Sequence, residues 1–282
     1  MTIYQKILYI DQKKVRTNKG NVMRELEGKV AIVTGAGRLR GIGRAAAVSL
    51  ARLGANVVIT GTGRDPANYP EDEKEIGWKD IHSTAEQVEL EGSKALPLVS
   101  NVTSSQAVTE MVNATLDEFG RIDILVNNAA YARAEDRVPI TDLPEDVFKK
   151  VNDIKVFGSY LCAKAVSKVL IDQGQGGKIV NLSSTAGKSG TANTLAYNAA
   201  NFAIVGMTQS MARELGQYNV NVNCVCPGYT ETSRMDGLDM EEAAKNTAIG
   251  RVGTDDEVGD LIAHLCTKVT SWITGQLINI NG

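Results

Sequence analysis

Disulfide chemistry has little support in this sequence, which contains four cysteines in 282 residues. Cys162, Cys224, Cys226 and Cys266 are too few to form the disulfide framework of a small secreted protein. Cys224 and Cys226 alternate within an apolar run, where alternate side chains share one face of a strand, so we expect packing rather than metal binding. We therefore expect a cytoplasmic location, in which thiols stay reduced.

Basic charge and long apolar runs are also lacking. The sequence has 30 Lys and Arg against 33 Asp and Glu, a formal net charge of -3, which argues against nucleic-acid binding because that needs a basic surface. No apolar run approaches the roughly 18 residues that span a bilayer, and residues 1–21 lack the features of a secretory signal. His82 and His264, the two histidines, lie in separate polar stretches, so neither a histidine metal site nor hydrolase chemistry is expected.

The sequence does contain a regular alternation of short apolar runs and helical stretches. Such runs suit strands buried on both faces of a parallel sheet, and helices between them imply right-handed crossovers. We predict an α/β fold: a single-domain, Rossmann-type, doubly wound parallel sheet with helices on both faces. The predicted strands are 30–34, 56–60, 95–99, 122–126, 177–182 and 220–225, and the first predicted helix is 44–53.

The chain is expected to have two parts. Residues 1–22 are basic and polar, and we expect this extension to be peripheral: a flexible arm, an oligomer contact or an unused upstream start. Residues 23–282 are expected to form a single domain. Within it, residues 65–80 contain two prolines and an acidic cluster and are predicted to form a long loop after the second strand.

A glycine-rich turn joins the first predicted strand to the first predicted helix. Gly35, Gly41 and Gly43 let the backbone turn tightly and let a pyrophosphate approach the amides at the helix N-terminus. With Thr34, they resemble the Thr-Gly-x-x-x-Gly-x-Gly pattern of the short-chain dehydrogenase/reductase family. The spacing is two residues longer, as if Leu39-Arg40 were inserted, so we expect the turn to bulge.

Further matches to this family extend along the chain. Asn127-Asn128-Ala129-Ala130 resembles the family's Asn-Asn-Ala-Gly, Pro227-Gly228 follows the sixth strand, and Thr232 lies where the family contacts the nicotinamide carboxamide. With residues 250–253 and 274–276, the matches cover about residues 26–282. The resemblance, which includes 3-oxoacyl-carrier-protein reductase-like members, implies the predicted fold, a nicotinamide cofactor and an oxidoreductase. It therefore implies that residues 23–282 form one dinucleotide-binding catalytic domain.

The resemblance also locates the dinucleotide site. An acidic residue at the end of the second strand would hold the adenosine ribose, but Gly61 stands there, and Arg38, Arg40 and Arg64 lie nearby. Guanidinium groups suit a phosphate, which favours NADP(H) and leaves NAD(H) open; alternatively, all three arginines are solvated. The expected cofactor-binding residues are Gly35, Arg38, Arg40, Gly41, Ile42, Gly43, Gly61, Thr62, Asn101, Val102, Asn127, Ala129, Tyr197, Asn201, Pro227, Gly228, Thr230 and Thr232.

Ketone reduction needs a proton donor beside the carbonyl oxygen. Tyrosine, with an unperturbed pKa of about 10, suits this task when a nearby cation stabilises the phenolate. The family uses Tyr-x-x-x-Lys, because residues four apart share a helix face, together with a serine and an asparagine. The resemblance assigns Ser184 to orient the substrate oxygen and Tyr197, thirteen residues later, to act as acid and base.

The lysine of this pattern is missing. Asn201 stands where the family has lysine, and Lys155 stands where it has asparagine, three residues before Gly158. We predict that the two have exchanged places: Lys155 supplies the cation from the other helix, and Asn201 holds a ribose hydroxyl or a relay water. Alternatively, Lys155 is solvated, as lysines usually are, and catalysis is weakened or lost.

The predicted function is an NAD(P)(H)-dependent oxidoreductase that interconverts a secondary alcohol and a ketone by hydride transfer. The alternatives are a dinucleotide-binding sensor or scaffold with little catalysis, and an epimerase or dehydratase. The expected partner is a small carbonyl or alcohol substrate; the rim segments 131–138, 185–195 and 229–240 show no obvious charge clamp that would identify it. The resemblance implies a homo-oligomer, a tetramer or dimer, and neither a nucleic-acid nor a membrane partner is expected.

Overall fold

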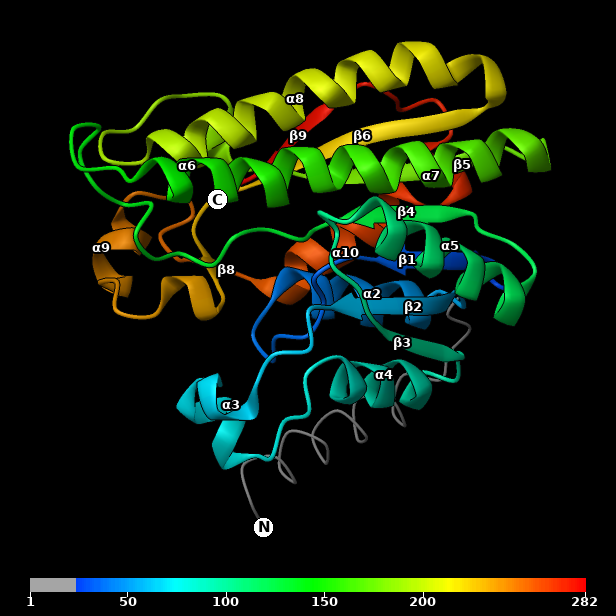
Figure 1. Ribbon diagram of the computed structural model, residues 1–282, viewed down its shortest axis with the longest axis horizontal. Helices are drawn as coiled ribbons and strands as arrows, with labels where there is room; N and C mark the ends of the chain where they lie inside the picture. The colour runs from blue at the N-terminus through cyan, green and yellow to red at the C-terminus, as the bar shows by residue number, and fades with distance from the viewer. Residues whose placement is uncertain (1–23) are drawn as a thin grey trace.

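Seven parallel strands form one sheet at the centre of the computed structural model, which describes residues 24–282 (Figure 1). Their order is β3-β2-β1-β4-β5-β6-β9, so the chain winds outward first on one side of β1 and then on the other, and the predicted doubly wound sheet is confirmed. The strands are β1 (Val30–Val33), β2 (Asn56–Gly61), β3 (Ala95–Val99), β4 (Ile124–Asn127), β5 (Gly177–Leu182), β6 (Val220–Pro227) and β9 (Leu277–Ile280). The basic extension 1–22 lies outside the described residues.

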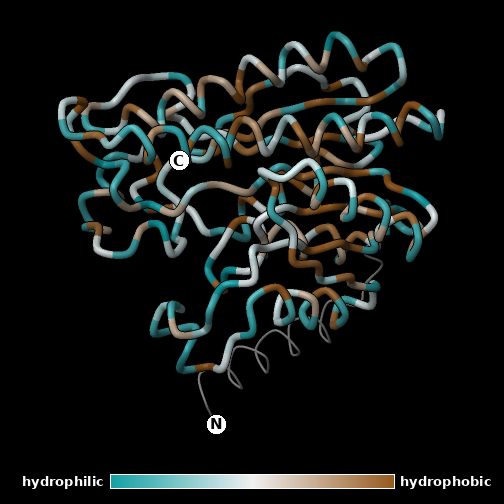
Figure 2. The backbone as a smooth tube through the Cα atoms, in the orientation of Figure 1, coloured by the Kyte–Doolittle hydropathy of each residue, from teal (hydrophilic) through white to brown (hydrophobic). Residues whose placement is uncertain are grey.

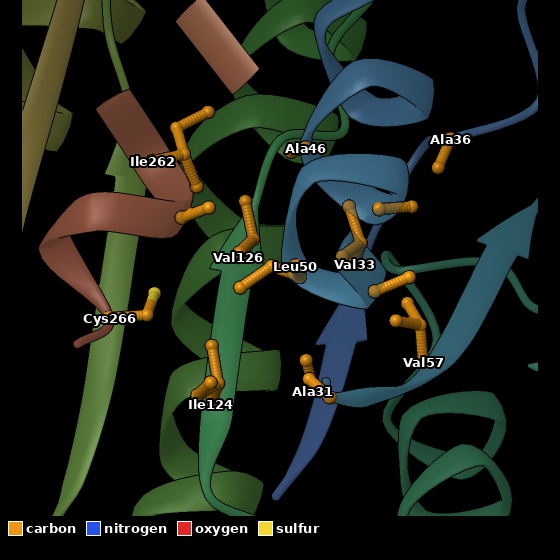
Figure 3. Packing of buried hydrophobic residues seen from close by; sticks show 14 of the residues in the cluster. Ala31, Val33, Ala36, Ala46, Leu50, Val57, Ile124, Val126, Ile262 and Cys266 are labelled. Atoms are coloured by element: carbon orange, nitrogen blue, oxygen red, sulfur yellow. The ribbon is translucent and has the colours of Figure 1, made fainter. Parts of the chain in front are cut away.

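Helices cover both faces of this sheet. One layer contains α2, α4 and α10, and the other contains α5, α7 and α8. Figure 3 shows Leu50 of α2 between Val33 of β1 and Val126 of β4, with Ala46 of α2 and Ile262 of α10 in the same cluster. The helices are α2 (Ile42–Arg52), α3 (Glu71–Glu75), α4 (Ile81–Leu90), α5 (Ser105–Phe119), α6 (Glu145–Asn152), α7 (Gly158–Gln173), α8 (Leu195–Leu215), α9 (Met240–Lys245) and α10 (Asp255–Leu265).

The strands are apolar along their whole length because each of their faces is covered by helices. Val33 and Val126 pack with α2 and α10, whereas Ile32 and Leu125, one residue earlier, pack with α5 and α7. Successive side chains of a strand point to opposite faces, so both alternating sets must be hydrophobic. The central strands are accordingly coloured as hydrophobic in Figure 2.

The prediction of one long loop at residues 65–80, after β2, is wrong in part. Residues 66–68 form a single 3-10 turn, and α3 is a short helix that projects from the sheet (Figure 1). Three acidic residues occupy the first turn of α3, where the positive end of the helix dipole stabilises carboxylates. This segment therefore carries a concentration of negative charge close to the carboxyl end of β2.

Two short strands, β7 (Thr230–Glu231) and β8 (Gly253–Thr254), form a separate parallel pair ahead of α10. They are too short to leave a strand pattern in the sequence. Within residues 24–282, no helix combines the length and the apolar character needed to cross a membrane. The strand order reverses between β1 and β4, and a crevice at such a point is where doubly wound sheets bind ligands.

Candidate active site

The glycine turn after β1 and the loop after β4 are bound to each other at this crevice. The Thr34 hydroxyl accepts hydrogen bonds from the Asn128 and Ala129 amides, both at 3.1 Å. The Asn128 side chain donates to the carbonyl oxygens of Thr34 and Gly35 at 3.0 and 2.8 Å. A Cβ on Gly43 would lie 2.5 Å from Asn128 Nδ2 and 2.7 Å from Gly35 O, so this close approach requires glycine.

A cavity of about 620 Å³ opens beside the turn. Thr60, in its lining, has a buried hydroxyl without a hydrogen-bond partner among the described residues, which leaves a polar group for a ligand to satisfy. The expected cofactor-binding residues in this lining are Gly35, Arg38, Arg40, Gly41, Ile42, Gly43, Gly61, Thr62, Asn101, Val102, Ala129 and Thr232.

Arg64 belongs to a cluster of charges beside Gly61. Its guanidinium contacts Glu73 at 2.8 Å and Asp80 at 3.0 Å, and both acidic residues are buried. A Cβ on Gly37 would meet Asp80 Oδ1 at 1.7 Å, so this carboxylate lies directly against the glycine turn. The strand β2 ends with Gly61, which has no side chain. The segment after β2 places the Asp80 carboxylate at this end of the cavity instead. Sequence spacing does not reveal this carboxylate, because Asp80 belongs to a different segment from the glycine turn and from the end of β2.

The extra residues of the glycine turn pack against the same segment. The Leu39 amide donates to Glu73 at 3.0 Å, and Arg40 contacts Asp72 at 2.6 Å. The Trp78 indole donates to a carbonyl oxygen of the turn at 2.6 Å. The longer turn, a departure from the family's pattern, and the acidic segment therefore stabilise each other.

Arg38 differs from the other two arginines at this end of the cavity. Arg40 and Arg64 are ion-paired, whereas Arg38 is half-buried and contacts no carboxylate in residues 24–282. Burial, together with repulsion by Arg64, lowers the pKa of Arg38. The interpretation of all three arginines as merely solvated is therefore wrong for Arg40 and Arg64, and of the three only Arg38 has no carboxylate partner among the described residues.

A second cavity, of about 430 Å³, adjoins the first. Ile42, Asn128 and Thr232 line both cavities, so the two are continuous. All four expected catalytic residues line the second one, together with the remaining cavity-lining residues of the expected cofactor set: Ser184, Tyr197, Lys155, Asn201, Pro227, Gly228 and Thr230.

Asn127 is the expected cofactor residue that lines neither cavity. It is buried, and its side chain donates to Asn181 Oδ1 at 2.9 Å, which ties β4 to β5. The next residue, Asn128, faces both cavities instead. In β6, Cys224 and Cys226 are buried free thiols with sulfur atoms 3.9 Å apart, which confirms their packing role.

Lys155 lies on a π-helical turn, Asp153–Phe157, between α6 and α7. Such turns insert a residue into a helix and are frequent at functional sites. The Lys155 carbonyl accepts a hydrogen bond from Ser159 Oγ at 2.6 Å, and the residue is only 6% exposed, so the alternative of a solvated lysine is wrong. Burial, with a smaller contribution from Arg234, lowers the pKa of Lys155 to about 8.

Ser184 and Asn201 are oriented by the backbone around Tyr197. Ser184 Oγ accepts a hydrogen bond from the Ala186 amide at 3.2 Å. Asn201 Nδ2 donates to the Tyr197 carbonyl at 2.8 Å, and Asn201 Oδ1 is buried without a partner among residues 24–282. An unsatisfied buried acceptor costs about 1–3 kcal/mol, so this oxygen marks a place for a ligand hydroxyl or a water.

Two arginines that the sequence pattern does not single out gather at Tyr197. Their Cζ atoms lie 4.0 Å (Arg137) and 5.3 Å (Arg234) from the centre of the tyrosine ring. They belong to the rim segments 131–138 and 229–240, which meet only in the folded chain. Neither segment shows this arrangement in its own sequence, because the two arginines come together only in the folded chain.

The chain is similar to known proteins over most of its length. The sequence profile described as Enoyl-(Acyl carrier protein) reductase matches residues 35–282. A 3-oxoacyl-[acyl-carrier-protein] reductase from Synechocystis sp. is 34% identical over 261 residues, which cover 92% of this chain and 98% of that protein. A short-chain dehydrogenase/reductase from Aspergillus oryzae is 36% identical over 264 residues, 91% of this chain and 94% of that protein.

Solved structures agree with these relatives. The acetoin dehydrogenase from Enterobacter cloacae superposes with a TM-score of 0.76 at 31% identity, covering 93% of this chain and 96% of its own. A short-chain type dehydrogenase/reductase from Mycobacterium marinum gives a TM-score of 0.78 at 29% identity, covering 92% and 96%. Fold, motifs and relatives agree over nearly the whole chain, which therefore belongs to the short-chain dehydrogenase/reductase family of NAD(P)(H)-dependent oxidoreductases.

Proposed function

We propose that this enzyme interconverts a secondary alcohol and a ketone, with Tyr197 exchanging the proton and Ser184 orienting the substrate oxygen. Lys155 supplies the cation that the family takes from a lysine at the position of Asn201. The observation that carries the proposal is the one cavity that all four residues line. Because this cavity is continuous with the one beside the glycine turn, a substrate and a dinucleotide can meet there.

The residues of the two cavities fit a dinucleotide. The glycine turn leaves no room for a Cβ at Gly43. The Thr60 hydroxyl and Asn201 Oδ1, which have no partner within residues 24–282, offer hydrogen bonds to ribose hydroxyls. The pyrophosphate belongs at the amides that begin α2, and Thr232 belongs at the carboxamide. When bound, the nicotinamide group supplies or accepts the hydride.

We also propose a preference for NADP(H), supported by Arg38. This guanidinium borders the first cavity, contacts no carboxylate in the described part of the chain and is repelled by Arg64. A 2′-phosphate would relieve that repulsion and accept paired hydrogen bonds. The Asp80 carboxylate is nearby, and its contact with Arg64 at 3.0 Å offsets part of its charge.

Lys155 stabilises the negative charge that forms on Tyr197 Oη when the proton leaves. A positive charge in a partly enclosed cavity acts on a developing oxyanion more strongly than one in water. With a pKa of about 8, the Lys155 ammonium stays mostly protonated at neutral pH. Asn201, whose Oδ1 is unsatisfied, holds a ribose hydroxyl or a relay water beside it.

The test is cofactor oxidation at 340 nm with a panel of ketones, in the native enzyme and in Lys155→Met and Asn201→Lys. We expect Lys155→Met to lose about 10²- to 10⁴-fold in kcat, the usual range for a proton-transfer group, with dinucleotide affinity retained. Lys149→Met is the matched control, because this lysine lies on the neighbouring α6 with a side chain 74% exposed. Native activity that survives in Lys155→Met contradicts the exchange.

A second candidate is a dinucleotide-binding protein with little turnover, which the missing lysine at position 201 favours. Dinucleotide binding without turnover, and activity appearing in Asn201→Lys, would establish it. Product formed without a net change in cofactor redox state would indicate an epimerase or dehydratase instead.

We further propose a homo-oligomer acting in the cytoplasm. Phe157, Tyr160 and Phe202 are each more than a third exposed on the layer of α7 and α8, and an oligomer contact would cover them. The four buried free thiols suit a reducing compartment. Light scattering on the purified enzyme tests the oligomer, and fractionation of cells tests the location.

A further inference from the structure

The lining of the cavity at Tyr197 carries more positive than negative charge. This lining, all within residues 24–282, contains Arg133, Arg137, Lys155 and Arg234 and no aspartate or glutamate. Four cations that share one cavity repel one another unless anions are nearby. An arrangement of this kind is typical of a site that receives a negatively charged ligand.

Arg133 and Arg234, unlike Arg137, have no carboxylate partner among residues 24–282. Arg133 and Arg234 donate to the backbone carbonyl oxygens of Arg234 and Tyr131, respectively. Arg137 has Asp136 as its acidic neighbour, with 3.6 Å between Nε and Oδ2. Burial, with repulsion by Arg234 and Arg133, leaves the pKa of Arg137 lowered even so. An anion between these guanidinium groups would remove the repulsion.

The phosphates of a dinucleotide do not account for Arg137. The glycine turn and Arg38, which suit those phosphates, border the first cavity, whereas Arg137 borders only the second. Its guanidinium stacks on the face of Tyr197, 4.0 Å from the ring centre, and that of Arg234 lies 5.3 Å from it. An anion held by this pair would lie within a few bonds of a carbonyl group that faces the tyrosine.

We infer that the substrate is an oxo acid or hydroxy acid whose anionic group, a carboxylate or a phosphate, binds Arg137 and Arg234 while its carbonyl or hydroxyl oxygen faces Tyr197 and Ser184. The inference rests on the proposed function, in which Tyr197 exchanges the proton. The anionic group forms and breaks no covalent bond; it fixes the orientation of the substrate through paired hydrogen bonds to guanidinium. Neutral ketones of the same shape lack this anchor.

The test compares matched substrates in the cofactor-loaded enzyme. 2-Oxobutanoate and 3-oxobutanoate are compared with their methyl esters, and dihydroxyacetone phosphate with dihydroxyacetone. We expect kcat/KM for at least one anion to exceed that for its neutral partner about 100-fold, the range of one charge-assisted contact pair. Preference within the carboxylate pairs or within the phosphate pair identifies the anionic group. If kcat/KM for the methyl esters is as high as that for the acids, the inference is overturned.

Variants separate this anchor from the catalytic groups. Arg137→Gln should erase the preference for the anion mainly through KM, and Arg137→Lys should keep part of it. Arg213 is an exposed arginine on the same helix as Tyr197, so Arg213→Gln should leave both the preference for the anion and KM unchanged. Dinucleotide affinity should stay unchanged in all three, and equal loss of activity toward acids and esters would contradict the assignment.

A binding measurement distinguishes failure of this inference from failure of the proposed function. Malonate and inorganic phosphate are titrated calorimetrically into the cofactor-loaded enzyme. If no carbonyl compound turns over but one of these anions binds and Arg137→Gln abolishes that binding, the proposed function fails and the anion site stands. If neither anion binds and neutral ketones turn over, the function stands and the anion site is refuted.

Discussion

Burial of Lys155 on the π-helical turn removes most of the water around its ammonium and lowers its pKa to about 8. The same burial makes the charge effective, because little water screens it inside the cavity. Asn201, on α8, presents an unsatisfied carbonyl oxygen to the same cavity. At the residue scale, therefore, an amide and an ammonium share the cavity that holds Tyr197.

The pH dependence of the reaction tests the charge on Lys155. The ammonium is protonated below its pKa of about 8 and loses its proton above it, so kcat/KM for reduction should fall as pH rises through about 8. In Lys155→Arg the guanidinium stays charged, and the fall should move to higher pH. Initial rates between pH 6 and 10 measure the pH at which kcat/KM falls. If that pH is the same in Lys155→Arg as in the native enzyme, the role of Lys155 is refuted.

Arg38→Gln tests the phosphate contact. We expect the Kd for NADPH to rise about 10- to 100-fold, the value of one or two charge-assisted hydrogen bonds, and the Kd for NADH to change little. Arg40→Gln is the comparison, because Arg40 is already paired with Asp72 and Asp236. Nucleotide fluorescence gives both constants, and equal losses for the two nucleotides would exclude a 2′-phosphate contact.

At the scale of elements, α10 holds the helix that begins at the glycine turn. Asp255, the first residue of α10, accepts a hydrogen bond from the Gly41 amide at 2.9 Å and contacts Arg44 at 2.7 Å. One turn later, Gly259 lies against α2 so closely that a Cβ would meet the Ala45 carbonyl carbon at 2.6 Å. The position of α2 therefore depends on this packing, and so does the shape of the first cavity, which α2 borders.

Gly259→Ala should destabilise the enzyme by about 1–3 kcal/mol, because the added methyl group overfills a rigid helix contact. Gly206→Ala is its control: Gly206 is also inside a helix, α8, but a Cβ there would meet nothing within 4 Å. That change should be neutral or stabilising by up to about 1 kcal/mol. Urea unfolding gives both values, and similar effects at the two glycines would show that helix propensity, not packing, decides.

For the whole molecule, the two cavities span the point where the strand order reverses, so a dinucleotide bound as proposed would contact both halves of the sheet. Ligands that bind only the folded state stabilise it. The preferred nucleotide at about 100 times its Kd should therefore add about 2.7 kcal/mol to the free energy of unfolding. Urea unfolding with and without nucleotide measures this gain.

Gly43→Ala should abolish most of that gain, because its Cβ would press on Asn128 Nδ2 at 2.5 Å and distort the turn. Gly190→Ala, a loop position with open space around it, should keep the gain. A full gain in Gly43→Ala would show that the turn does not hold the nucleotide.

Much of the fold follows from local patterns in the sequence. Apolar runs such as 177–182 predicted a strand at its observed bounds, and helices between such runs led to the doubly wound sheet. The glycine spacing located the turn that borders the first cavity. These features depend on neighbouring residues and on which side chains can be buried, and both can be read from the sequence itself.

The tertiary structure alone decided how the charges are arranged. Lys155 is buried on a π-helical turn, and helical periodicity does not reveal such a turn. Asp80 reaches the glycine turn, and Arg137 meets Arg234 at Tyr197, through contacts between segments far apart in the chain. The sequence determined the sheet and the family, whereas long-range packing determined which charged groups surround the reacting atoms, because electrostatic interactions depend on distance in space and not along the chain.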